Sequence, residues 1–224
     1  MKKLKFVLII VVILAGLLIA SLTGLPSSHN PFSKNENTAT AENDWKLILV
    51  NKDNRIPDKY EVKLLKLSNE QKIDERIYPE LQKMFNDARA SGLELFVAQG
   101  YRTAEEQQRL LDNKRKAYEN EGKSPEEAKK LAEQWVAVPG TSEHQLGIAV
   151  DINADTKKCK ANDVYKWLEE NAHKYGFIKR YPDDKTDITG IINEPWHYRY
   201  VGTEAATKIY EQGLCLEEYI ESIS

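Results

Sequence analysis

Cysteine is scarce in this chain of 224 residues, which has only Cys159 and Cys215. The sequence therefore contains no CxxC pair, and this excludes a thiolate zinc knuckle and a thioredoxin-like redox site. The two thiols are either unpaired or joined in one disulfide, a bond that an oxidising compartment would permit. Spacing along the chain does not decide between these alternatives, because a disulfide depends on the distance between the two Cα atoms.

The chain also lacks a block of basic residues. Its formal net charge is −3, with 32 Lys and Arg against 35 Asp and Glu. Three of the lysines (Lys2, Lys3 and Lys5) lie at the extreme N-terminus, so the remainder is more acidic than the whole. A mildly acidic body without a basic patch is poorly suited to hold phosphate backbones. The composition therefore argues against a nucleic acid partner.

One long apolar run, from Phe6 to Ala20, lies in the N-terminal segment 1–25. With residues 21–25 it reaches about the 20 residues that a membrane-spanning helix needs. The lysines before it favour a cytoplasmic N-terminus and send the following chain outward. We expect a single-pass anchor in the cell membrane that carries an extracellular domain. The alternative is a cleaved signal peptide and a secreted protein, but a cut after Ala20 would place Leu18 where a small residue is preferred.

Residues 26–44 are rich in Ser, Asn, Thr and Pro and contain one isolated Phe. Such a segment buries too little apolar surface to offset the entropy lost on ordering, so it predicts a flexible linker. His29 is then a solvated linker residue. Residues 45–224 have an ordinary globular composition and are long enough for one well-filled core.

Strand-like and helix-like patterns are interspersed irregularly in residues 45–224. Strand candidates such as Trp196–Val201 mix apolar and charged residues, unlike the apolar runs of a buried parallel sheet. We therefore predict an α+β fold with a small antiparallel sheet flanked by helices. The expected strands are 45–50, 93–98, 148–152, 177–181 and 196–201. The expected helices start at Pro79, Thr103, Ser124, Asp163 and Thr203, and the last of them ends near Gly213.

The most informative stretch is SEHQLGIAVDI, residues 142–152. Branched residues alternate with small or polar ones from Ile148 to Ile152, which is the period of a strand with one face in the core. The other face carries small residues and then Asp151, so it leaves room for a ligand beside a carboxylate. His144 is an odd number of positions from Asp151 and cannot share that face in one regular strand. We expect it in the turn before Gly147, from where its imidazole can reach Asp151.

A second stretch, Glu194-Pro195-Trp196-His197, follows about forty residues later. Pro195 has no backbone N–H and suits the start of a strand or an edge strand. It would place Glu194 at a bend and His197 just inside the strand.

Together, His144, Asp151 and His197 supply two imidazoles and one carboxylate. Three such ligands with an open fourth position are typical of a catalytic zinc site, where a bound water has a pKa of about 7. Glu194, three residues before a ligand, is the candidate general base. From spacing alone, a metal-free His–Asp pair and a solvated surface glutamate remain alternatives. His173, the other histidine beyond the linker, is interpreted as helix packing.

These residues resemble the VanY-type D-alanyl-D-alanine carboxypeptidases, zinc metallopeptidases of the hedgehog/D-Ala-D-Ala peptidase fold. The matching pattern is S-x-H-x-x-G-x-A-x-D followed by E-x-W-H, which stands here at residues 142–151 and 194–197. The segment Gly100-Tyr101-Arg102-Thr103, with Gln107, is similar to that family's upstream motif, in which serine is commoner at the position of Thr103. The likeness covers residues 81–202.

The resemblance implies a role for each matching residue. The positions of the zinc ligands are His144, Asp151 and His197, and the position of the catalytic base is Glu194. Arg102 matches the arginine that holds the substrate carbonyl, and a fixed guanidinium beside a developing negative charge is physically sensible. The residues that match those positioning the terminal end of the peptide are Ser142 and Gln107.

The implied activity is hydrolysis of the terminal D-Ala-D-Ala bond of peptidoglycan stem peptides, with Zn2+ as cofactor and D-alanine as product. Alternatives are an L,D-carboxypeptidase that trims tetrapeptide stems, an endopeptidase that cuts elsewhere in the stem, and a non-catalytic wall-binding module. The presence of Glu194 beside all three ligand positions argues against the last. Residues 114–135 are longer and more charged than a tight connection requires, so they predict a surface helix pair or a lid.

Overall fold

The computed structural model describes residues 44–224 and has the predicted α+β architecture. Its main sheet has four antiparallel strands in the order β3-β4-β6-β5. These strands are β3 (Leu95–Gln99), β4 (Ala149–Ala154), β6 (His197–Tyr200) and β5 (Phe177–Lys179). A separate antiparallel pair consists of β1 (Leu64–Lys66) and β2 (Lys72–Asp74).

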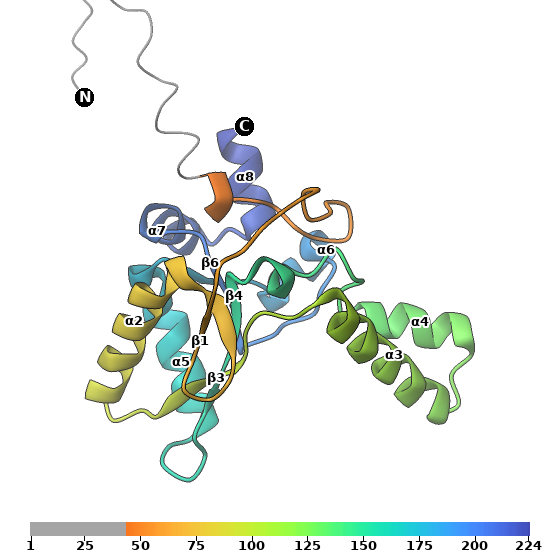
Figure 1. The fold of residues 1–224 in the computed structure, drawn as a ribbon, viewed down its shortest axis with the longest axis horizontal. Helices are drawn as coiled ribbons and strands as arrows, with labels where there is room; N and C mark the ends of the chain where they lie inside the picture. The colour runs from red at the N-terminus through yellow and green to blue at the C-terminus, as the bar shows by residue number, and fades with distance from the viewer. Residues whose placement is uncertain (1–43) are drawn as a thin grey trace, which may run out of the picture. The chain divides into compact units, whose positions relative to one another are not determined.

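Seven α-helices surround these sheets in the described part of the chain. They are α2 (Tyr78–Ala90), α3 (Ala104–Asn120), α4 (Pro125–Glu133), α5 (Ala161–Asn171), α6 (Thr186–Thr189), α7 (Thr203–Gln212) and α8 (Leu216–Ile223). Five short 3-10 segments add η1 (Asp44–Lys46), η2 (Glu75–Ile77), η3 (Glu143–Leu146), η4 (Ala172–Tyr175) and η5 (Asp183–Lys185). The pair α3–α4 stands at one end of the domain, apart from α2 and α5 (Figure 1).

The core lies between the main sheet and α2 and α5. Ile148, Val150 and Ile152 are fully buried, which confirms the period-two pattern of this segment. On α2, the apolar stripe that includes Leu81 and Met84 packs into the same cluster. A smaller cluster lies under α7 and α8. One face of β4 is therefore fixed by core packing, and the other face is left for the functional residues.

Helix α3 begins at the predicted capping box. The hydroxyl of Thr103 accepts from the backbone N–H of Glu106, and the Glu106 carboxylate accepts from the backbone N–H of Thr103. Ser124 caps α4 in the predicted manner. Gln107 is the one buried residue of α3. A helix that buries a polar side chain instead of an apolar stripe points to a polar site beneath it.

Three predicted elements differ from the structure. The predicted strand 45–50 is not formed: its first two residues belong to η1, and the backbone carbonyls of Lys46 and Ile48 accept from the Arg199 guanidinium instead of a neighbouring strand. Asp163 is not the cap of α5; the helix starts at Ala161, and Asp163 lies in its first turn, where a negative charge favours the helix dipole. Helix α7 is not the last helix, since α8 follows its C-terminal glycine.

Both cysteines are unpaired thiols. Cys159 contacts the backbone of Glu94, and Cys215 is buried at the start of α8. Burial raises the pKa of the Cys215 thiol to about 11, so it stays protonated. The predicted anchor and all but the last residue of the predicted linker lie outside the described residues. Among residues 44–224, no helix is both long and apolar enough to cross a membrane.

Gly100 joins β3 to the segment before α3, and the main chain of β2 passes very close to it. A Cβ built there would lie 2.1 Å from the Lys72 carbonyl oxygen. We expect Gly100→Ala to destabilise the domain by about 3 kcal/mol, because the obstructing atom is backbone and cannot rotate away. Urea denaturation of the variant would measure this loss.

Gly122→Ala is the matched control for this substitution. Gly122 has a φ of +89° but nothing within 4 Å of its added Cβ, so only the left-handed backbone penalty of about 1 kcal/mol applies. Equal stability of Gly100→Ala and the unmodified protein would contradict the close approach of these two chains.

Candidate active site

His144 lies in η3, directly before the chain turns into β4. The turn is closed by Gly147, whose φ of +75° is in the left-handed region that favours glycine. The Nδ1 atom of His144 is 2.8 Å from the carbonyl oxygen of Gly100. Because a carbonyl can only accept, Nδ1 carries the hydrogen and Nε2 presents a lone pair. This nitrogen is 3.4 Å from Asp151 Oδ1, as the turn prediction required.

Asp151 and His197 face each other across two paired strands. They are direct partners in the antiparallel register of β4 and β6. Opposite residues in such a pair project their side chains to the same face. The result is a distance of 3.2 Å between Asp151 Oδ1 and His197 Nδ1. Two side chains 46 positions apart in the sequence therefore meet through the register alone.

One ligand atom from each of His144, Asp151 and His197 can be chosen so that all lie within 4.8 Å of one another. Ligands at about 2.1 Å from a tetrahedral zinc lie about 3.4 Å apart, which is close to the two distances from Asp151. Asp151 Oδ1 is buried and has no hydrogen-bond partner among the described residues. An oxygen that faces two imidazole nitrogens without a bond to either fits a metal ligand. Two nitrogens and one oxygen are donors that zinc accepts.

The protonation of the metal-free cluster follows from its burial and charges. Burial lowers the pKa of His144. For Asp151, burial favours the neutral form, but His144 and His197 outweigh it and hold its pKa below the usual range. Burial opposes the charged form of His197 as well, yet its contacts with Asp151 and Glu143 raise its pKa to about 9. A metal that binds this cluster at neutral pH must therefore displace a proton from His197.

Glu194 lies at the bend before β6, as the position of Pro195 predicts. Its Oε2 atom is 3.5 Å from His197 Nδ1. Burial raises the pKa of Glu194 to about 7, while His197 and Arg102 act in the opposite direction. A carboxylate with a pKa near neutrality can both take up and release a proton at working pH.

Arg102 approaches the cluster from the segment before α3. Its Nη2 atom is 3.9 Å from Asp151 Oδ2, and its Nη1 donates to Gln107 Oε1 at 2.7 Å. Gln107 in turn donates to the carbonyl of Ala137 at 2.6 Å. Both functional groups of Gln107 are thus engaged with the protein, so this residue holds Arg102 in place. The buried Nε atom of Arg102 has no partner among the described residues.

All seven predicted site residues line one cavity of about 150 Å³. Ser142 contributes from the turn before His144, and its hydroxyl forms no hydrogen bond with the described residues. The helix pair predicted for residues 114–135 is formed by the second half of α3 and by α4. Leu110 of α3 and Trp135, which follows α4, line the cavity. His173 lies elsewhere and stacks on Tyr210, as expected of a packing residue.

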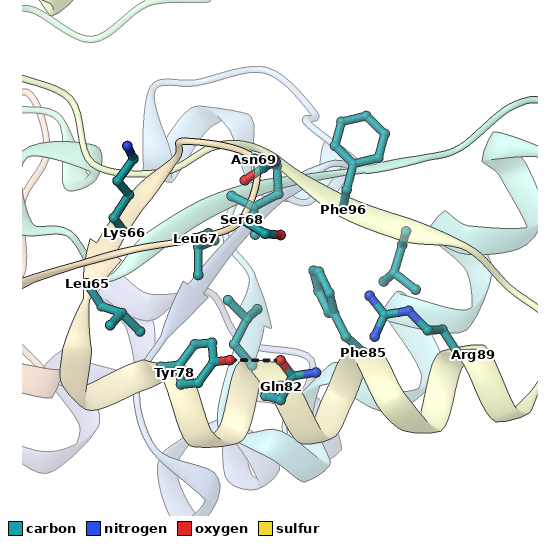
Figure 2. A pocket seen from close by; sticks show the side chains of 13 residues that line it. Leu65, Lys66, Leu67, Ser68, Asn69, Tyr78, Gln82, Phe85, Arg89 and Phe96 are labelled. Carbon is teal, nitrogen blue, oxygen red and sulfur yellow. Dashed lines mark hydrogen bonds between the residues drawn. The ribbon is translucent and has the colours of Figure 1, made fainter.

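A larger cavity, about 320 Å³, is a groove between β1, α2 and β3. Phe85, Tyr78 and Phe96 line it, and Tyr78 hydrogen-bonds Gln82 within it (Figure 2). Its lining contains none of the predicted site residues and no histidine or carboxylate side chain. Size alone would have selected the wrong location, and the chemistry of the lining residues identifies the smaller cavity as the site.

Sequence reasoning missed the buried charges beneath the cluster. They are Glu143, Arg180 and Arg199, whose side chains are all fully buried. Burial disfavours ionised Glu143, but the two guanidinium groups outweigh it and hold its pKa well below the usual range. The signal was available: Arg199 sits in a strand pattern between two tyrosines, and a charged residue in a central strand needs a buried partner.

Comparisons with known proteins agree with this geometry. The family model described as VanY, D-alanyl-D-alanine carboxypeptidase, matches residues 70–203. A D-alanyl-D-alanine carboxypeptidase of Enterococcus faecalis is 57% identical over 206 residues, which cover 89% of this chain and 76% of that protein.

Two solved structures are also similar. VanYB in complex with D-alanine-D-alanine is 60% identical with a TM-score of 0.79, and the match covers 80% of this chain and 99% of that one. A variant of the vancomycin resistance D,D-pentapeptidase VanY in complex with Zn(II) is 61% identical with a TM-score of 0.77, covering 79% and 99%. The chain belongs to the VanY family of D-alanyl-D-alanine carboxypeptidases.

Proposed function

We propose that this protein is a zinc-dependent D,D-carboxypeptidase that hydrolyses the terminal D-Ala-D-Ala bond of peptidoglycan stem peptides and releases D-alanine. The observation that carries the proposal is the convergence of His144, Asp151 and His197 on one cavity that also contains Glu194 and Arg102. Membership of the VanY family and the likeness to a Zn(II) complex and a D-Ala-D-Ala complex support it.

His144 Nε2, His197 Nδ1 and a carboxylate oxygen of Asp151 would hold the zinc. Zinc in such a site polarises a carbonyl and lowers the pKa of a coordinated water to about 7. The protein supplies the orientation of the ligands. The hydrogen bond from His144 Nδ1 to Gly100 fixes one ring, and the strand register fixes Asp151 and His197.

Glu194 acts as general base and then as general acid. Its carboxylate takes a proton from the attacking water and delivers it to the nitrogen of the departing D-alanine. A pKa raised to about 7 suits both steps, because a group that releases protons as readily as it accepts them works in either direction near neutrality.

Arg102 stabilises the negative charge that develops on the carbonyl oxygen of the scissile bond. Its guanidinium is largely buried, and Gln107 fixes its direction. A donor held in place before the reaction contributes more than one that must reorient during it. Ser142 lines the same cavity with an unengaged hydroxyl, which would hydrogen-bond the end of the peptide.

The N-terminal segment would keep this activity outside the cell. Residues 1–25 combine three lysines with an uncharged apolar run, and residues 26–44 have the composition of a linker. An anchored extracellular domain suits a substrate that lies in the cell wall.

The function is tested with two synthetic peptides, one ending in D-Ala-D-Ala and one ending in L-Lys-D-Ala. We expect D-alanine to be released from the first, to stop when a chelator removes the metal, and to return when Zn2+ is added. An enzymatic assay for free D-alanine measures all three. Release from only the L-Lys-D-Ala peptide would replace the D,D assignment with an L,D one.

Glu194→Gln is the matched variant for this assay. The substitution keeps the shape of the side chain but removes its basicity, so we expect turnover to fall by about 10² to 10⁴. Zinc content, measured by atomic absorption, should stay at the level of the unmodified protein. Undiminished turnover would exclude Glu194 as the base.

Zinc uptake should release protons in a way that depends on pH. At pH 6, metal-free His197 is protonated because its pKa is raised to about 9, whereas the pKa of His144 is lowered. We expect zinc binding to Glu194→Gln to release about one proton at pH 6 and to tighten by about tenfold per pH unit up to pH 7, above which a zinc-bound water would release a second proton. Calorimetry in two buffers with different ionisation enthalpies measures the number of protons.

The unmodified protein should release more than one proton in this experiment. The charge of the metal lowers the pKa of Glu194 from about 7, so this carboxyl also loses a proton at pH 6. Zinc binding to Glu194→Gln without proton release would contradict the protonated state of His197.

Anchoring is tested with the full chain carrying a C-terminal tag in bacterial cells. We expect the tag in the membrane fraction, resistant to high salt, and accessible to protease added to protoplasts. Deletion of residues 1–25 should leave the tag in the cytosol. A soluble tag in the medium would favour a cleaved signal peptide, and a protease-resistant tag would contradict the outward orientation.

A further inference from the structure

Glu143 is a fully buried carboxylate inside the zinc-binding sequence motif, and the proposed reaction gives it no role. It lies between Ser142 and His144 in η3, with its side chain completely inaccessible to solvent. One oxygen, Oε1, accepts from Arg180 Nε at 2.8 Å and lies 2.9 Å from Arg199 Nη1. Each buried charge costs several kcal/mol of desolvation, which pairing only offsets. A cluster of one carboxylate and two arginines therefore needs a reason beyond stability.

The other oxygen of Glu143 faces a zinc ligand. Oε2 is 3.7 Å from His197 Nε2. Both atoms are buried, and neither has a hydrogen-bond partner among the described residues. Each unsatisfied buried polar atom costs about 1–3 kcal/mol, and a movement of less than about 1 Å would satisfy both at once. Hydrogen bonds of this kind are often long in unliganded sites and tighten in the loaded state.

His197 therefore has a carboxylate on each side of its ring. Nδ1 faces Asp151 and Glu194, and Nε2 faces Glu143. A ring nitrogen that binds a metal must present a lone pair, so the hydrogen has to reside on the other nitrogen. An ionised carboxylate accepts hydrogen bonds but cannot donate them. The position of Glu143 next to Nε2 therefore selects the ring form of His197 that carries its hydrogen on Nε2.

We propose that Glu143 is a positioning residue for the zinc site, which holds the Nε2–H of His197 and thereby directs Nδ1 toward the metal. This inference rests on the proposed zinc-dependent function. A metal-binding histidine commonly donates its second N–H to a carboxylate, and loss of such a partner typically costs 10- to 100-fold in metal affinity. Glu143 acts through His197 and does not touch the substrate.

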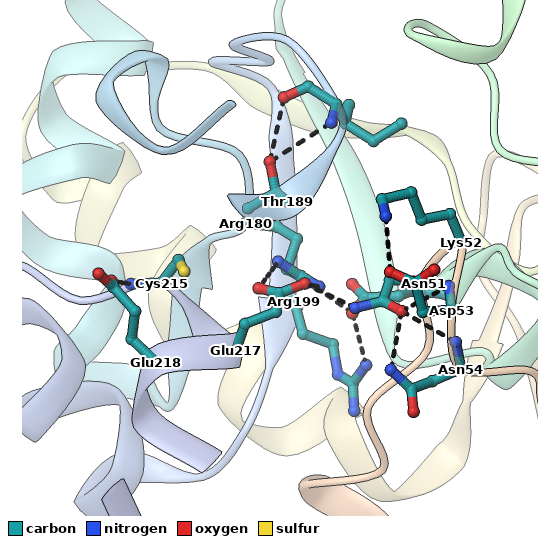
Figure 3. Close-up of polar contacts among 12 residues, drawn as sticks. Asn51, Lys52, Asp53, Asn54, Arg180, Thr189, Arg199, Cys215, Glu217 and Glu218 are labelled. Carbon is teal, nitrogen blue, oxygen red and sulfur yellow. Dashed lines mark hydrogen bonds and ion pairs between the residues drawn. The ribbon is translucent and has the colours of Figure 1, made fainter. Parts of the chain in front are cut away.

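The surroundings of Glu143 keep its carboxylate from turning away. Glu217 of α8 pairs with Arg180 through two hydrogen bonds of 2.7 and 2.9 Å, and Asn51 donates to Glu217 (Figure 3). On the other side, Arg199 donates to the carbonyls of Lys46 and Ile48. Each guanidinium group thus contacts Glu143 and also donates to a second acceptor that fixes its position. Two carboxylates and two guanidinium groups balance in charge, so the cluster can stay buried.

The arginines also determine what an amide would do at position 143. Guanidinium groups only donate, so the amide oxygen of Glu143→Gln must turn toward Arg180 and Arg199. Its NH₂ group then faces His197 Nε2 and needs an acceptor there. The ring satisfies it by moving its hydrogen to Nδ1, the nitrogen that should bind zinc. The substitution therefore favours the wrong ring form while it preserves the shape of the side chain.

We expect Glu143→Gln to weaken zinc binding by about 10- to 100-fold. The full chain in detergent, stripped of metal, is titrated with zinc against a fluorescent chelator of known affinity. Asp74→Asn is the matched control, because Asp74 is also fully buried and paired with an arginine, Arg76, but does not touch the zinc ligands. It should change the melting temperature and leave zinc affinity within about threefold of the unmodified protein.

A second measurement separates positioning from a general loss of structure. In zinc-loaded protein labelled with 15N histidine, the Nε2 proton of His197 should resonate far downfield and exchange slowly with water. It should stay there in Asp74→Asn and shift upfield or disappear in Glu143→Gln. An unchanged resonance together with unchanged zinc affinity in Glu143→Gln would overturn the inference.

The outcomes for the inference and for the proposed function are distinct. Failure of the unmodified protein to bind zinc would overturn the proposed function itself. Zinc binding by the unmodified protein with equal affinity in Glu143→Gln would leave the function intact and refute only the role of Glu143. If Glu143→Gln does not fold, the proton spectrum of the unmodified protein decides: rapid exchange of the His197 Nε2 proton would refute the role.

Discussion

The antiparallel register of β4 and β6 sets Asp151 directly across from His197, and the rest of the site is arranged around that pair. A strand shifted by one residue would turn every side chain to the opposite face. Asp151 would then point into the core, and the branched residues from Ile148 to Ile152 would point into the cavity. The burial of those branched side chains prevents the shift. Hydrophobic packing on one face of β4 thus fixes the chemistry on the other.

Backbone geometry brings the third ligand to the same place. Gly147 allows the left-handed turn that returns His144 toward the strand. Gly100 has no side chain, so the main chain packs closely there, and its carbonyl accepts from the His144 ring. Arg102 follows Gly100 by two residues, and its backbone N–H donates to the His144 carbonyl. Arg102 and the proposed zinc ligand His144 are therefore connected through one short stretch of backbone. This close packing requires Gly100 in one motif and Gly147 in the other.

Much of this arrangement could be predicted from the sequence, because its signals are local. The alternation around Val150, the capping box at Thr103 and the odd spacing of His144 from Asp151 each depend on a few neighbouring residues. They predicted β4, α3 and the turn that the structure contains. The resemblance to VanY proteins supplied the roles of residues, which spacing alone left open.

The features that escaped prediction depend on partners far along the chain. Residues 45–50 have the composition of a strand, but the Arg199 side chain donates to the carbonyls of Lys46 and Ile48, and no local pattern reveals that competition. The engagement of Gln107 with Ala137 could not be foreseen for the same reason. Glu143 was an unremarked position in the motif because its meaning comes from Arg180 and Arg199, which lie more than thirty residues away.

The pairing of Glu217 with Arg180 links the integrity of the site to a helix outside the main sheet. Glu217 lies in the first turn of α8, and its carboxylate accepts two hydrogen bonds from the Arg180 guanidinium, which in turn donates to Glu143. Local unfolding of α8 would remove one carboxylate from a buried cluster of two acids and two arginines. The uncompensated positive charge beneath His197 would then disfavour a metal cation above it. Fraying of a peripheral helix can thus impair the site while the central sheet stays folded.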